Sequence, residues 1–282
     1  MTQTLEPQTH SGVGTPTPQE RVDAWLAGFE AALAARDVTA AAGMFATDSF
    51  WRDLVSFTWN LKTVEGREQI TDMLTARADD TAPSGFTTSE PATDEDGVAA
   101  AFIEFETRTG RGIGHLRLRT DDETGVDQAW TLLTTLQELK GHEEPRGTKR
   151  VRGAVHGSDP DTRSWAERKA DEEANLGRSD QPYVLVVGGG QGGIALGARL
   201  RQLGVPSIVI DRHDRPGDQW RKRYKSLCLH DPVWYDHLPY LPFPRQLAGV
   251  RSQRQDRRLA RVLHAHHGSA LLEQDHLRIG VV

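Results

Sequence analysis

The sequence of 282 residues contains a single cysteine, Cys228. One thiol excludes an intramolecular disulfide, a zinc site built on cysteines and a catalytic CxxC pair. No run approaches the roughly 18 to 20 apolar residues that a membrane-spanning helix needs, so we predict no membrane partner. Residues 1–20 lack the charged and apolar regions of a secretory signal and are rich in Thr, Pro and Gly. We therefore predict a disordered lead-in and a cytoplasmic protein.

The last part of the chain lacks residue types that the rest contains. Residues 245–282 have no aromatic residue and no lysine, although the chain has 7 Trp, 4 Tyr and 8 Phe. This tail carries seven arginines against three acidic residues, whereas the formal net charge of the whole chain is -6. Basic charge without aromatic stacking partners does not favour nucleic-acid binding, and the histidines of the tail lack a pattern of metal ligands. We predict no nucleic-acid partner and no metal site.

The first part of the chain combines helical and strand periodicity. Apolar residues between 22 and 33 recur at helical spacing, and residues 38–45 repeat the pattern. Strand-like runs follow at 98–107, 113–119 and 128–138. Helices that precede an antiparallel sheet predict an α+β domain in which a curved sheet wraps the helices and leaves a pocket.

A glycine-rich turn follows a polar linker. A buried strand, the turn, a helix and a second buried strand succeed one another, which is the order of a βαβ unit. The turn satisfies GxGxxG with Gly188, Gly190 and Gly193. These glycines permit a tight turn, close approach of the backbone to a pyrophosphate, and close packing of the helix on the strand. Asp211 ends the second strand, where an acid accepts hydrogen bonds from ribose hydroxyls, so FAD or NAD fits and a 2′-phosphorylated NADP does not.

The predicted fold class is an α+β cone-like domain followed by an incomplete α/β Rossmann-type βαβ unit. The predicted layout is a lead-in (1–20), the α+β domain (21–139), a linker (140–180), the N-terminal part of the Rossmann-type domain (181–244) and a tail (245–282).

The segment after Asp211 resembles the flavin-containing monooxygenases, particularly their bacterial, fungal and plant auxin-forming branch. The resemblance rests on GDQWR at 217–221, KSLCLHDP at 225–232 and LPYLPFP at 238–244. Members usually have Glu at the position of Asp211, and either carboxylate can reach the ribose. Trp220 fits a core position as well as a cofactor contact. The residues predicted to bind the cofactor are Gly188, Gly190, Gln191, Gly192, Gly193, Asp211, Arg212, Gln219, Trp220, His230 and Asp231.

The resemblance implies a monooxygenase that binds FAD, is reduced by NADPH and oxygenates a small organic substrate through a C4a-hydroperoxyflavin. The second GxGxxG unit that the family uses for NADPH and the FxGxxxHxxx(F/Y/W) signature do not occur in this sequence. Codons can be chosen that encode residues 245–278 in the present reading frame. The same nucleotides, read one position later, encode a sequence that begins GNWPVFAPKDK and is similar to the sequence that follows LPFP in members of the family. We therefore expect a frameshifted, disordered tail and a truncated, inactive chain whose sheet buries one face poorly.

The N-terminal segment FWRDLVSFTWNLKTVEGREQI, residues 50–70, resembles the ketosteroid-isomerase-like, nuclear-transport-factor-like cone. The resemblance makes Asp53 a candidate acid or base, beside the alternative that it is a structural hydrogen-bond partner. It also implies a possible homodimer through this domain. The alternative function is a non-catalytic module in which the cone binds a small molecule or dimerises and the glycine unit is vestigial. A flavoprotein disulfide reductase shares the glycine fingerprint but needs a dithiol, which a single cysteine does not provide.

Overall fold

The computed structural model describes residues 16–150, 163–224, 226–227, 231, 235, 237–242, 270–272 and 278–281. The chain divides into two compact units, residues 1–143 and 144–282. Among the helices in these ranges, none has the length and apolar character needed to cross a membrane.

Helix α1 (Pro18–Ala34) begins inside the segment that the sequence predicted as a lead-in. Thr17 and Glu20 form a capping box, which satisfies two backbone donors at the start of the helix, and Pro18 occupies a position where no donor is needed. Trp25 and Phe29 lie on the buried face of α1 and stack with ring centroids 4.8 Å apart. The capping signals therefore extend the helix beyond its apolar pattern, and its buried face forms one wall of the core.

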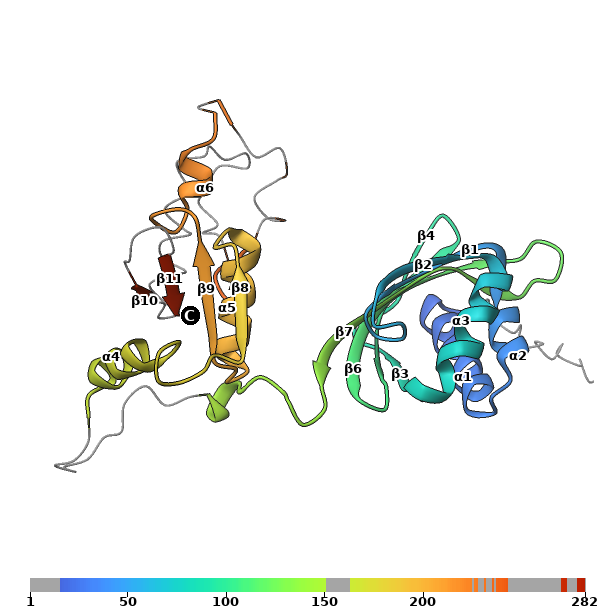
Figure 1. Ribbon diagram of the computed structural model, residues 1–282. Helices are drawn as coiled ribbons and strands as arrows, with labels where there is room; N and C mark the ends of the chain where they lie inside the picture. The colour runs from blue at the N-terminus through green and yellow to red at the C-terminus, as the bar shows by residue number, and fades with distance from the viewer. Residues whose placement is uncertain are drawn as a thin grey trace, which may run out of the picture. The chain divides into compact units, whose positions relative to one another are not determined.

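Two further helices complete the helical layer of the N-terminal unit. The side chain of Asp37 caps α2 (Val38–Gly43) by accepting a hydrogen bond from the Ala40 amide. Helix α3 (Gly66–Thr81) ends where Ala82 adopts the left-handed conformation. All three helices lie along one face of the N-terminal sheet (Figure 1).

Seven strands form the N-terminal sheet, in the order β2-β1-β7-β6-β5-β3, with β4 paired to β5. The pairing of β1 with β7 is parallel and the other pairings are antiparallel, so the predicted antiparallel sheet is wrong for one pair. After β6 the chain reverses direction and β7 lies between β1 and β6, where it runs antiparallel to β6 and in the same direction as β1. The strands are β1 (Phe45–Leu54), β2 (Leu61–Glu65), β3 (Ser84–Thr88), β4 (Thr93–Glu95), β5 (Val98–Glu106), β6 (Gly110–Thr120) and β7 (Asp127–Leu139).

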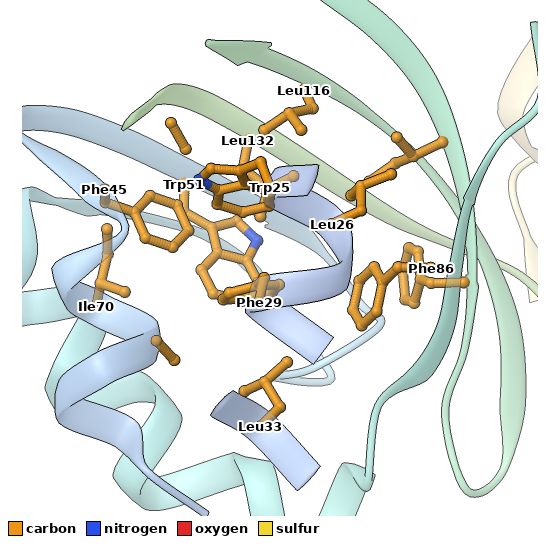
Figure 2. Close-up of a cluster of buried hydrophobic side chains, with 14 of the residues drawn as sticks. Trp25, Leu26, Phe29, Leu33, Phe45, Trp51, Ile70, Phe86, Leu116 and Leu132 are labelled. Carbon is orange, nitrogen blue, oxygen red and sulfur yellow. The ribbon is translucent and has the colours of Figure 1, made fainter. Parts of the chain in front are cut away.

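Aromatic side chains fill the space between the sheet and the helices (Figure 2). Phe45 and Trp51 from β1 stack at 5.6 Å, and Phe29 meets both edge-on. The space in which the sequence predicted a pocket is thus occupied by rings, because large side chains from both layers meet there. The buried rings are Trp25, Phe29, Phe45, Trp51, Phe57, Phe86 and Phe105. The α+β cone itself is confirmed.

The C-terminal unit contains the predicted βαβ unit, formed by β8 (Val184–Val187), α5 (Gln191–Gln202) and β9 (Ser207–Asp211). Strands β8 and β9 are parallel. The region predicted as a linker holds a short 3-10 helix, Gly147–Lys149, and helix α4 (Trp165–Asn175), which Ser164 and Glu167 cap reciprocally. A fourth helix of this unit, α6 (Asp218–Arg221), follows β9.

The segment predicted as a disordered tail contributes two short strands, β10 (Ala270–Leu272) and β11 (Arg278–Val281). Strand β11 pairs antiparallel with β9, and the order of the sheet is β10-β11-β9-β8. The structure differs from the prediction here because β9 offers an open edge of backbone donors and acceptors, which a short extended segment can satisfy.

Strand β8 forms the opposite edge of this sheet. Val186 packs with Val209 in a small core, whereas Leu185 is 57% exposed and Val187 is 79% exposed. Parallel strands are normally covered on both faces. The expectation that this sheet buries one face poorly is therefore confirmed for β8.

Candidate functional site

The turn between β8 and α5 has the geometry that its glycines predict. The backbone angle φ of Gly188 is 109°, a value that residues with a Cβ rarely adopt. A Cβ on Gly193 would lie 1.7 Å from the carbonyl oxygen of Gly188, so only glycine fits where the helix crosses the end of the strand. The turn thus brings the first turn of α5 close against the carboxyl end of β8.

The N-terminus of α5 has free capacity for a ligand. Gly190 is the N-cap residue and provides no side-chain cap, so the amides of the first turn depend on another acceptor. The side-chain nitrogen Nε2 of Gln219 is buried and makes no hydrogen bond to any residue that the structure describes. A Cβ on Gly190 would have this nitrogen as its nearest neighbour, at 3.9 Å. Helix amides and an unpaired amide donor therefore lie beside one glycine, an arrangement that fits an anionic pyrophosphate.

Asp211 lies against the same turn. Its Oδ2 accepts a hydrogen bond from the Gly189 amide at 2.5 Å, and its Oδ1 accepts one from the His213 amide at 2.7 Å. The sequence predicted an acid at the end of the second strand, and the structure brings it to the glycine turn. Each carboxylate oxygen keeps a further lone pair, so the side chain has the acceptors that a ribose diol requires.

Helix α6 carries Gln219 and is fixed by Asp218, which is 2% exposed. Burial by itself raises the pKa of Asp218, but the hydrogen bond from Arg221 and the nearby charges of Arg215 and Lys222 outweigh burial and lower it. The carboxylate therefore stays ionised and forms ion pairs with cations of its own segment, Arg215, Arg221 and Lys222. Sequence reasoning missed this role, although the Gly-Asp pair before an Arg at helical spacing was a usable signal.

The remaining predicted residues differ in how far they are buried. Trp220 is half-buried on α6, with the Arg223 guanidinium 5.1 Å above its ring. Gln191 and Gly192 are exposed in the first turn of α5, and Arg212 and Asp231 are also exposed. His230 lies outside the described residues, as does Cys228.

Asp53, the candidate acid or base of the N-terminal unit, is fully buried. Its carboxylate accepts hydrogen bonds from the Ser56 hydroxyl at 2.5 Å and the Thr134 hydroxyl at 2.8 Å. It also accepts from the Phe57 amide at 3.1 Å and from the amide and hydroxyl of Thr58 at 2.8 and 2.7 Å. Donors of the chain itself thus surround both oxygens, which is the environment of a structural hydrogen-bond partner.

Comparisons with known proteins agree with the assignment of the C-terminal unit. Residues 186–240 match the family model of the NAD(P)-binding Rossmann-like domain. An uncharacterized CzcO-like oxidoreductase of Geobacillus kaustophilus (strain HTA426) is 43% identical over 56 residues, which are 20% of this chain and 16% of that protein. A probable indole-3-pyruvate monooxygenase of Arabidopsis thaliana, YUCCA4, is 42% identical over 65 residues, 23% of this chain and 16% of that protein. The matched segment thus covers about a sixth of the length of these relatives.

Solved structures were similar to the N-terminal unit. A ketosteroid isomerase-like protein from Erwinia carotovora atroseptica SCRI1043 aligns with a TM-score of 0.36 and 11% identity, covering 43% of this chain and 96% of its own. The strand order and helix packing of this chain establish its cone independently of that likeness. The predicted resemblance to monooxygenases is confirmed over a short segment, 65 residues long in the match to the Arabidopsis thaliana protein. After its N-terminal α+β cone, the chain therefore carries a segment that matches the NAD(P)-binding Rossmann-like domain and is similar to a short part of proteins named as an oxidoreductase and a monooxygenase.

Proposed function

We propose that the C-terminal unit binds FAD and belongs to a flavin-dependent monooxygenase that, in complete form, is reduced by NADPH and oxygenates a small organic substrate. The observation that carries the proposal is the cluster at the end of β8: an uncapped helix N-terminus, the unpaired Nε2 of Gln219 and the carboxylate of Asp211. The names of the relatives, an oxidoreductase and monooxygenases, support the reaction class.

The residues of this chain would bind the adenosine diphosphate half of the cofactor. The first amides of α5 and the Gln219 side chain would donate hydrogen bonds to the pyrophosphate, where negative charge is also favoured by the helix dipole. Asp211 would accept from the ribose hydroxyls and disfavour a 2′-phosphate through like charge. When bound, the flavin supplies the redox chemistry, and the protein contributes orientation and exclusion of water.

We further propose that this chain by itself binds FAD weakly and does not turn over. Leu185 and Val187 leave the strand that carries the glycine turn covered on one face only. A strand with an open edge and an exposed apolar face holds its turn less firmly than one inside a sheet. The cofactor site would therefore lack part of the support that orders it.

Titration of the purified chain with FAD, followed by quenching of flavin fluorescence, tests the proposal. The variant Gly190→Ala places a methyl group beside Gln219 without a clash, so the fold should persist while FAD affinity falls at least ten-fold. The matched control is Leu196→Ala, on the exposed face of the same helix, which should bind like the original chain. Equal binding by both variants, or saturable binding of NADPH in preference to FAD, would contradict the proposed site.

The alternative function is a non-catalytic module whose cone either binds a small molecule or dimerises, and only the second form gains support. Because aromatic rings fill the inside of the cone, the described residues favour association through the cone over capture of a small molecule inside it. A folded chain that binds neither FAD nor NAD would shift the assignment to this module.

A further inference from the structure

Helix α6 is short for an element that carries a residue of the nucleotide site. It contains four residues, so its own backbone hydrogen bonds stabilise little more than one turn. Gly217, directly before it, adopts the left-handed conformation with a φ of 84°, so the helix begins at a tight turn. The orientation of Gln219 therefore depends on the side chains that tie α6 to this turn.

The guanidinium of Arg221 makes this connection. Its Nη1 donates a hydrogen bond to Oδ1 of Asp218, and its Nη2 donates one to the carbonyl oxygen of Pro216 at 2.7 Å. Only 12% of the Arg221 side chain is exposed. One acceptor lies before the helix and the other lies in its first turn, so a single planar group spans both. Such a fork fixes the helix relative to the turn.

The other two cations near Asp218 hold it less tightly. Nε of Arg215 lies 3.7 Å from Oδ1, and Nζ of Lys222 lies 4.0 Å from Oδ2. The Arg215 side chain is 60% exposed and the Lys222 side chain is 56% exposed. Ion pairs that face water contribute little, because solvent and salt screen them. Arg221 is therefore the cation that matters most for the position of α6.

Gln219 is two residues before Arg221 on the same helix. Its buried Nε2 is the nearest neighbour of a Cβ built on Gly190, at 3.9 Å. A hydrogen bond weakens steeply as its length and angle depart from their best values. A displacement of α6 by about 1 Å would therefore withdraw this donor from an anion bound at the glycine turn.

We propose that Arg221 is a positioning residue of the nucleotide site, which holds α6 so that Gln219 presents its amide to the pyrophosphate of the cofactor. This role rests on the proposed function, because the pyrophosphate is the group that Gln219 would meet. Nη1 and Nη2 of Arg221 are already engaged with Asp218 and Pro216. The effect of Arg221 on binding therefore passes through Gln219.

Affinity for ligands with and without phosphate groups tests this role. FAD binding is followed by quenching of flavin fluorescence, and ADP and adenosine are titrated as competitors of FAD. Arg221→Lys keeps the positive charge but replaces the planar fork by one ammonium group, which does not reproduce both hydrogen bonds. It should weaken binding of FAD and ADP about ten-fold, as expected for one hydrogen bond to a charged group, and leave adenosine unchanged.

A double-mutant cycle with Gln219→Ala separates positioning from a general effect on the fold. Gln219→Ala alone should weaken ADP binding by a similar factor. Because Arg221 acts through Gln219, the double variant Gln219→Ala/Arg221→Lys should bind ADP no more weakly than Gln219→Ala. A general effect on the fold would instead weaken adenosine binding too, and the two losses in ADP affinity would multiply.

The matched control is Arg178→Lys, the same replacement at an exposed arginine of the same unit. It should bind all three ligands like the original chain. The positioning role is overturned, while FAD binding stands, if Arg221→Lys binds ADP normally, loses adenosine to the same extent, or multiplies the loss of Gln219→Ala. An original chain that binds neither FAD nor ADP would overturn the proposed function and this role with it.

Discussion

Replacement of Asp53 by alanine tests whether its carboxylate is structural. The side chain is fully buried and satisfies the amides of Phe57 and Thr58, which have fixed positions in the backbone. Alanine leaves these two donors without their acceptor. Each unsatisfied buried donor costs about 1 to 3 kcal/mol, so we expect a loss of about 4 kcal/mol, a large fraction of the roughly 5 to 15 kcal/mol typical of a domain.

Native-state hydrogen exchange measures this loss on the N-terminal unit alone, because peptides from β6 and β7 report its opening separately from the C-terminal unit. A loss of about 4 kcal/mol corresponds to about 1000-fold faster exchange at globally protected amides. Asp53→Asn is the matched variant. Its amide oxygen can accept from the Phe57 and Thr58 amides, while the hydroxyls of Ser56 and Thr134 can rotate to accept from its nitrogen.

Asparagine should therefore cost less than about 1.5 kcal/mol. If alanine changes exchange less than ten-fold, or if asparagine is as damaging as alanine, the structural account of Asp53 is refuted. The first outcome would mean that the carboxylate adds little to stability, and the second that its charge matters for a reason other than these hydrogen bonds.

Three other outcomes are expected. Gly193→Ala should abolish FAD binding and the exchange protection of α5 while the N-terminal unit keeps its protection, because the new Cβ would lie 1.7 Å from the Gly188 oxygen. The hydrogen bond from Arg21 is the main cause that lowers the pKa of Asp127, so this pair stabilises the fold above the unfolded pKa and loses its effect as pH falls through the folded one. The stability difference between the original chain and Asp127→Asn, measured by urea unfolding, should therefore shrink from pH 7 toward pH 3. Sequencing of the coding DNA across codons 240–260 should reveal a one-base change that restores GNWPVFAPKDK; an unchanged frame would contradict the frameshift interpretation.

Much of the geometry of the glycine turn was predictable from the sequence because its parts are local. Backbone geometry alone dictates a tight turn where three glycines at fixed spacing lie between a strand and a helix. The right-handed βαβ connection then places the acid at the end of the next strand beside this turn. Gly188, Gly193 and Asp211 therefore lie where the sequence predicted them. The unpaired donor of Gln219 could not be foreseen, because it depends on how α6 folds back toward Gly190.

The cone shows the same division between local and long-range information. Periodicity and capping residues identified its helices and most of its strands, since both depend on neighbours a few residues away. The parallel pairing of β1 with β7 joins residues such as Asp53 and Thr134, which are far apart in sequence and leave no periodic signal. That pairing places the Thr134 hydroxyl within hydrogen-bond distance of the Asp53 carboxylate. Ser56, Phe57 and Thr58 supply the other hydrogen bonds locally, so the carboxylate has a structural role.

The sequence by itself determined the two-unit organisation, the glycine turn and the chemistry that the turn favours, because each depends on the spacing and type of residues that are close together in the sequence. Only the tertiary structure decided that aromatic rings occupy the inside of the cone and that Thr134 of β7 lies opposite Asp53 of β1. Strand register sets these facts, and register is fixed by the packing of whole strands against one another rather than by any single segment.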